Sequence, residues 1–232
     1  RRQRQMCIRD SSGKQENNGI YFAGEDTLIR HLDTPSQETL AQNAGYINQL
    51  VANVSVPVYF GLIPSAAEVW ADRLPAGAPT ADEQAIIDEM YRAVLAHTVD
   101  LCTTLNAHRD EDLYYRTDHH WTDLGAWYAY EAWARANGLA LFDRSAAQAV
   151  TVEGFYGTNY SRARKPGIVP DTITYYDLPN ILSVEDNAGG EVTWEIGPLY
   201  EYSDFETRDK YKAFLRGNNA YSVLEGNGEG SI

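Results

Sequence analysis

The chain has 232 residues, which suits one domain or one domain with an insertion. Hydrophobic residues make up 44% of it and aromatic residues 12%, a content that allows a sizeable core and excludes a fully disordered chain. The net charge of −14 at pH 7 repels phosphate groups, which argues against nucleic acid and anionic lipid as partners.

The two ends of the chain differ from the rest. Residues 1–14 are rich in Arg and Gln, carry a positive charge and have no apolar period. We expect residues 1–16 to be a non-native or disordered head. The Gly-rich residues 226–232 are expected to be a truncated tail, which leaves residues 17–225 for the folded domain.

The first part of this domain alternates between strand and helix patterns. A turn before residue 20 leads into a predicted strand at residues 20–22, and apolar residues at helical spacing predict a helix over residues 35–51. Residues 54–63 are almost continuously apolar and rich in β-branched residues, which predicts a strand buried on both faces, as in a parallel sheet. A short helix is expected to follow, through Trp70.

The alternation continues as far as about residue 140. Thr80 and Glu83 have the spacing of a capping box and predict the start of a helix. Residues 99–101 and 113–115 are candidates for short strands, and residues 123–137 predict a helix. Strands that alternate with helices are typical of an α/β fold with a largely parallel sheet.

Beyond about residue 145 this pattern weakens. Residues 173–176 look like a strand, and residues 181–194 look like a hairpin around a turn at residues 187–190. We predict a β-rich insertion at about residues 150–205.

The segment most typical of a catalytic site is Thr117–Thr122, which holds an acid, two imidazoles, an indole and two hydroxyls. Asp118 and His120 are two positions apart, and in an extended segment such residues point the same way. We therefore expect their side chains to contact each other and His119 to point away. A carboxylate so placed fixes the tautomer of the imidazole, which is the orienting half of an acid–base–nucleophile triad.

Two other interpretations stay open. Asp118 could cap the following helix while the histidines only fill space. Alternatively Asp118, His119 and His120 could ligate Zn²⁺ with nearby His108, although adjacent histidines rarely bind one ion with good geometry. We favour the triad, which needs neither a metal nor an organic cofactor.

The residues around this motif carry a specific resemblance. Residues 114–130 resemble the DHHW family of bacterial proteins, named for the tetrapeptide found here at residues 118–121. Weaker similarities lie at residues 19–22, 56–60, 64–68 and 211–218. The family is similar to the SGNH-hydrolase-like domains of the alginate O-acetylation proteins AlgJ and AlgX. This implies a three-layer, flavodoxin-like parallel sheet with flanking helices, incomplete at its C-terminus.

The resemblance also implies roles for residues. Asp118 would be the orienting acid and His120 the general base, whereas the serine of the triad is expected beyond Ile232, in a chain truncated at both ends and inactive by itself. Within the chain, Ser65 is a possible nucleophile because it lies between an apolar strand and a helix, although helix capping is its other role. Candidates for substrate contact are Trp121, Tyr115 and Arg116.

The resemblance therefore implies an acyl (acetyl) transferase or esterase that acts on a cell-envelope polysaccharide. Its partners would be the polysaccharide or an acyl-donor protein, and its location extracytoplasmic, with a targeting segment missing and no membrane contact by this chain. The alternative is a non-catalytic envelope scaffold or glycan-binding module, which the abundance of Tyr and Trp favours.

Overall fold

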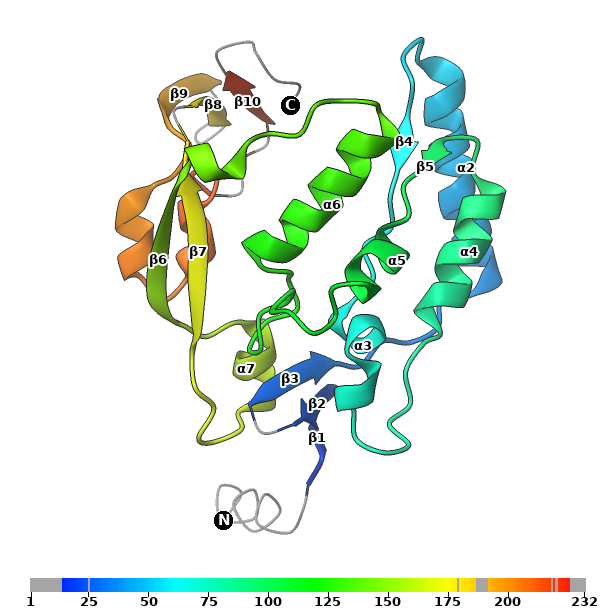
Figure 1. The fold of residues 1–232 in the computed structure, drawn as a ribbon, viewed down its shortest axis with the longest axis vertical. Coiled ribbons are helices and arrows are strands. Elements are labelled where there is room, and N and C mark those ends of the chain that lie inside the picture. Colours follow the sequence, from blue (N-terminus) through cyan, green and yellow to red (C-terminus); the bar gives the residue numbers. More distant parts are fainter. Residues whose placement is uncertain are drawn as a thin grey trace. The chain divides into compact units, whose positions relative to one another are not determined.

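The computed structural model describes residues 14–24, 26–178, 180–186, 192–217, 219 and 221–225, and it is a mixed α/β structure with small sheets (Figure 1). The chain divides into two compact units. The first comprises Arg1–Gly138 and Tyr156–Asp171, and the second comprises Leu139–Phe155 and Thr172–Ile232. Most of the predicted head, and all of the predicted tail, lie outside the described residues.

The first unit opens with a small antiparallel sheet of β1 (Glu16–Asn17), β2 (Ile20–Ala23) and β3 (Thr27–Arg30). The predicted strand at residues 20–22 is confirmed as β2. Gly19, at φ +76°, supplies the left-handed conformation that the turn before β2 requires. The sheet buries Ile20, Leu28 and Ile29, and α7 (Thr158–Ala163) packs beside β2 and β3.

Helices α2 (Gln37–Asn53) and α4 (Glu83–Ala93) lie side by side in this unit (Figure 1). The helix predicted over residues 35–51 is confirmed as α2. The prediction of a capping box at Thr80 is wrong, because α4 begins after Asp82. The Asp82 carboxylate caps the helix by accepting a hydrogen bond from the amide of Ala85 at 3.0 Å. The buried core between α2 and α4 consists of Leu40, Ala44, Met90 and Val94.

The strand predicted over residues 54–63 is largely wrong. Only β4 (Tyr59–Phe60) forms there, and it pairs in parallel with β5 (His97–Thr98). Val56 and Ile63 are 65% and 52% exposed, so the apolar run is not buried on both faces. The strand predicted at residues 99–101 is also wrong, because α5 (Leu101–Asn106) begins there. An extended three-layer parallel sheet is therefore not confirmed.

The helix predicted over residues 123–137 is confirmed as α6 (Asp123–Ala136), which Thr122 caps through its hydroxyl. In the segment before it, Tyr114 forms an isolated antiparallel bridge with Trp121, where a short strand had been expected. Tyr114 also belongs to a buried cluster with Trp70 and Leu105, against which Trp121 packs. The remaining short helices of this unit are α3 (Ala66–Val69) and η1 (Ala71–Arg73).

The second unit is rich in strands. Strand β6 (Gln148–Phe155) pairs with β7 (Asp171–Asp177), and β8 (Ile181–Asp186) pairs antiparallel with β9 (Thr193–Pro198) and β10 (Tyr221–Glu225). The predicted hairpin is confirmed by the pairing of β8 and β9, and its turn lies outside the described residues. The 3₁₀ helices of this unit are η2 (Arg144–Ala146), η4 (Tyr202–Glu206) and η5 (Lys210–Ala213).

None of the helices in the described ranges is long and apolar enough to cross a membrane.

Candidate functional site

The Asp-His-His-Trp motif lies in a loop whose two sides are held together like a short hairpin. The amide of Tyr115 donates to the carbonyl of His120 at 3.2 Å, and the amide of Thr122 donates to the carbonyl of Leu113 at 2.8 Å. Beyond these bonds, at the end of the loop, the backbone bends over residues 116–120. The motif therefore occupies the tip of a loop that is fixed at its base and leads directly into α6.

A buried carboxylate anchors this tip from a distant part of the sequence. Asp171 accepts hydrogen bonds from the amides of Arg116 (3.0 Å) and Thr117 (2.8 Å) and from the Thr117 hydroxyl (2.6 Å). The Arg116 guanidinium adds an ion pair, with Nε 3.3 Å from the carboxylate. These bonds fix the backbone immediately before Asp118.

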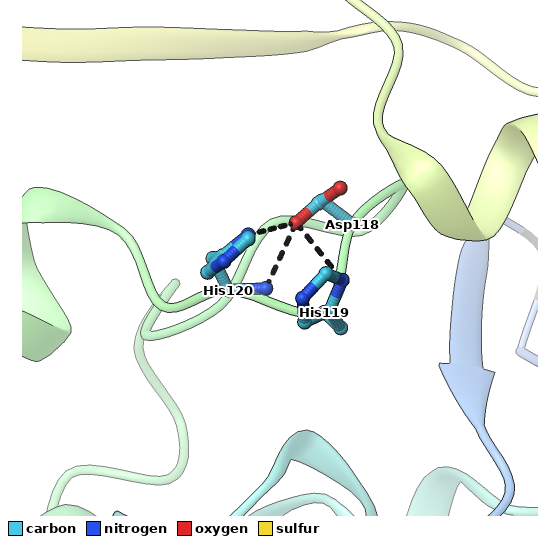
Figure 2. A group of neighbouring side chains, drawn as sticks. All are labelled: Asp118, His119 and His120. Atoms are coloured by element: carbon cyan, nitrogen blue, oxygen red, sulfur yellow. Dashed lines mark hydrogen bonds and ion pairs between the residues drawn. The ribbon is translucent and has the colours of Figure 1, made fainter. Parts of the chain in front are cut away.

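Asp118 is fully buried and its two oxygens have separate partners. Oδ1 lies 2.5 Å from Nδ1 of His120 and also accepts the His120 amide at 3.0 Å (Figure 2). Oδ2 accepts the amide of Thr158 at 2.6 Å and the Thr158 hydroxyl at 2.9 Å. The predicted contact between Asp118 and His120 is confirmed.

The physical reason for this contact differs from the predicted one. The loop is bent rather than extended, so alternation of side chains does not bring the two residues together. Asp118 instead accepts the amide two residues ahead, the local bond that Asp commonly forms in turns. The same bend places the His120 imidazole on that oxygen.

The prediction that His119 points away is wrong. Its Nδ1 lies 3.5 Å from Oδ1 of Asp118 and 2.7 Å from the hydroxyl of Thr158. Its ring centroid is 3.9 Å from that of His120. Both imidazoles therefore flank the carboxylate, as Figure 2 shows.

The surroundings of Asp118 keep it ionised. Burial by itself would raise its pKa, but the hydrogen bonds from His120 and Thr158 and the proximity of His119 outweigh this and hold the pKa well below its usual range. A buried carboxylate that stays charged can orient an imidazole and stabilise an imidazolium.

The zinc interpretation has partial geometric support. Asp118, His119 and His120 each offer one ligand atom, and these atoms lie within 4.8 Å of one another. His108 was the expected fourth ligand. It hydrogen-bonds Glu111 at 2.7 Å and stacks on Tyr128 instead, which leaves a group of three residues in the described part of the chain. The zinc interpretation stays a hypothesis.

Ser65 serves as the N-cap of α3. Its Oγ accepts the amide of Ala67 at 3.0 Å and donates to Oε1 of Glu83 at 2.5 Å, and Oε2 of Glu83 accepts the Ser65 amide at 2.8 Å. A carboxylate, rather than a histidine, holds this hydroxyl. The geometry therefore supports the capping role of Ser65.

We expect Ser65→Ala to reduce stability rather than activity. Loss of the cap should lower the free energy of unfolding by about 1 kcal/mol, and turnover should stay within a few-fold of wild type. Urea unfolding and an ester assay measure the two quantities, with Ser36→Ala, which removes the cap of α2, as the matched control. Loss of turnover in folded Ser65→Ala would instead identify Ser65 as the nucleophile.

The three residues predicted to contact substrate have different environments. Tyr115 is buried, so its ring packs inside the protein. Trp121 is partly buried and packs against two core clusters. Arg116 is tied to Asp171 and donates to the carbonyl of Pro170 at 3.1 Å. These contacts indicate support of the loop, and a role in substrate contact stays a prediction.

Gly157 is a site residue that sequence reasoning missed. A Cβ atom here would overlap the side chain of Asp118, and the Gly157 amide donates to the Thr117 hydroxyl at 3.0 Å. Its φ of −84° is open to any residue, so the requirement is for space rather than for a special backbone conformation. The close approach lets Thr158 reach the carboxylate.

Gly157→Ala is expected to displace Asp118, because the added methyl group has no room. The free energy of unfolding should fall by about 1–3 kcal/mol, as for other overpacked interiors, and the Asp118–His120 contact should be disturbed. Urea denaturation measures the first effect. Gly45→Ala is the control, since Gly45 lies in α2 with open space around it and the change should stabilise the helix. Equal stability of Gly157→Ala and wild type would contradict the packing argument.

The family model described as DHHW protein matches residues 18–229. No match was found among curated proteins.

Solved structures share the fold. A DHHW family protein from Eubacterium siraeum DSM 15702 is 24% identical, with a TM-score of 0.73 over 92% of this chain and 73% of that chain. Bacillus cereus PatB1 with sulfonyl adduct is 18% identical, with a TM-score of 0.71 over 92% and 76%. The O-acetyltransferase domain of Pseudomonas putida AlgJ is 19% identical, with a TM-score of 0.52 over 67% and 63%. Since the family model spans nearly all of the sequence, the chain belongs to the DHHW family, as its motif indicated.

Proposed function

We propose that the protein is an O-acetyltransferase or esterase of the SGNH-hydrolase type that acts on a cell-envelope polysaccharide. The observation that carries the proposal is the 2.5 Å contact between Nδ1 of His120 and the buried carboxylate of Asp118. A carboxylate that orients an exposed imidazole in this way is the acid–base half of a triad.

The proton transfers follow from which nitrogen faces Asp118. Because the carboxylate is ionised, Nδ1 of His120 carries the proton and Nε2 is the basic nitrogen. Nε2 takes the proton of a serine hydroxyl as its oxygen attacks the ester carbonyl. The imidazolium, stabilised by Asp118, then returns this proton to the departing alkoxide oxygen. An acceptor hydroxyl or water would release the acetyl group by the same steps in reverse.

The comparisons support this class of reaction in one respect. The AlgJ domain with the same fold is described as an O-acetyltransferase. By analogy we place the chain in an SGNH-like three-layer fold and outside the cytoplasm, with a polysaccharide or an acyl-donor protein as its partner.

A second candidate function is a glycan-binding module. Trp194 of β9 and Tyr221 of β10 are exposed, and both lie opposite Glu185 of β8 in the sheet register. Their side chains therefore share one face of the sheet, with ring centroids 5.8 Å apart. Exposed aromatic rings are suited to stacking on sugars.

The test is an acetyl-transfer assay. Protein that contains residues 1–232 together with any flanking sequence is incubated with 4-nitrophenyl acetate, with and without an oligosaccharide acceptor. We expect release of nitrophenol above background and acetylated oligosaccharide in the product. Oligosaccharide binding without turnover, lost in Trp194→Ala but kept in His120→Ala, would favour the binding module.

A further inference from the structure

The second histidine of the motif has a defined hydrogen-bonding environment of its own. The hydroxyl of Thr158 lies 2.9 Å from Oδ2 of Asp118 and 2.7 Å from Nδ1 of His119. This hydroxyl has a single proton, and the ionised carboxylate can only accept it. The hydroxyl must therefore accept from His119, whose proton lies on Nδ1.

Asp118 accordingly orients two imidazoles. It holds His120 directly, and it holds His119 through the hydroxyl of Thr158. Both rings then carry their proton on Nδ1, so Nε2 of His119 is a hydrogen-bond acceptor, as Nε2 of His120 is. The ring centroids are 3.9 Å apart, and the side chains are 39% and 50% exposed. A group bound by His119 would thus lie beside the group on which His120 acts.

We propose that His119 binds the acceptor hydroxyl of the substrate through Nε2, and that Thr158 is the positioning residue that fixes its tautomer. This inference rests on the proposed function. A neutral imidazole nitrogen accepts a hydrogen bond from an O–H group, and O-acetyl transfer requires a sugar hydroxyl at this site.

The charges around His119 favour the neutral form that this role needs. Burial lowers its pKa, and nearby His120, Arg30 and Arg162 lower it further, against the opposing effect of Asp118. These are the charged groups that face the ring from its own loop, from β3 and from α7.

The positioning by Thr158 can be tested without any activity. Long-range ¹H–¹⁵N NMR spectra report the tautomer of each histidine, and we expect the Nδ1–H form for His119 in wild type and in Thr158→Ser, which keeps the hydroxyl. Thr158→Val removes the hydroxyl and should give a mixture of tautomers. Thr104→Val, which removes a hydroxyl that donates to the carbonyl of Asp100, is the matched control and should leave the His119 signals unchanged.

The substrate contact is tested by kinetics. His119→Phe keeps a ring but loses Nε2, and it should raise KM for the oligosaccharide acceptor about tenfold while kcat falls by a smaller factor. An unchanged KM would overturn the contact, and an Nε2–H or doubly protonated His119 in wild type at pH 7 would overturn the positioning. Absence of turnover in wild type with the expected tautomer would refute the proposed function and the contact together, and leave the positioning by Thr158 supported.

Discussion

His120→Ala should reduce acetyl-ester turnover to background while the protein stays folded. Without the imidazole no group is placed to take the proton of the attacking hydroxyl, and loss of one such residue in serine proteases costs about 10⁶-fold in kcat. The fold should survive because the side chain is half exposed and because the amide of residue 120 can still donate to Oδ1 of Asp118. Truncation therefore leaves no buried cavity.

The measurement is kcat/KM for 4-nitrophenyl acetate, with circular dichroism and urea unfolding to verify the fold. His97→Ala is a matched control, since it removes an exposed imidazole of β5 that stacks on Tyr59. Full activity in folded His120→Ala would rule out the general-base role and favour the scaffold or binding-module interpretation.

Local sequence predicted the parts of this protein that depend on local interactions. Helices α2 and α6 have capping hydroxyls at Ser36 and Thr122, and their positions were predicted within two residues. The contact between Asp118 and His120 was also predictable, because it joins residues two apart. Family membership could be recognised from the same motif.

Features that depend on distant partners were missed. The apolar run at residues 54–63 has the composition of a buried strand, but composition does not supply a neighbouring strand, and pairing is limited to Tyr59 and Phe60. Likewise Asp171 holds Thr117, immediately before the motif, from 54 residues away along the chain, and Thr158 holds Asp118 from 40 residues away. No local sequence pattern indicates a role for Asp171 or Thr158, so their contacts with this loop could not be predicted from the sequence.

Asp118→Asn should lower turnover steeply, by about 10⁴-fold if the effect matches that of the same substitution in serine proteases. The reason lies in the hydrogen-bond donors that surround the carboxylate. Oδ2 faces the amide and hydroxyl of Thr158, so the carbonyl oxygen of an asparagine must take that position. Its NH₂ group then faces Nδ1 of His120 and favours the Nε2–H tautomer, which cannot take the proton of the attacking hydroxyl.

The pH dependence of stability gives an independent test of this carboxylate. The folded state holds the pKa of Asp118 below its unfolded value of about 4. A lowered pKa means that ionised Asp118 stabilises the fold fully above the unfolded value, and that this contribution is lost progressively as the pH falls from that value toward the lower pKa of the folded state. Asn has no such titration, so the free energy of unfolding of Asp118→Asn should fall less than that of wild type between pH 6 and pH 3.

Both effects are compared with Asp88→Asn, which changes an exposed carboxylate of α4. Gln84 donates a hydrogen bond to this carboxylate and can still donate to an amide oxygen. This control should keep wild-type turnover, because it leaves the loop that holds the two histidines unchanged. NMR spectra of His120 should show the change from Nδ1–H to Nε2–H in Asp118→Asn alone. A loss of less than tenfold, or an unchanged His120 tautomer, would show that Asp118 holds the loop together without directing the imidazole.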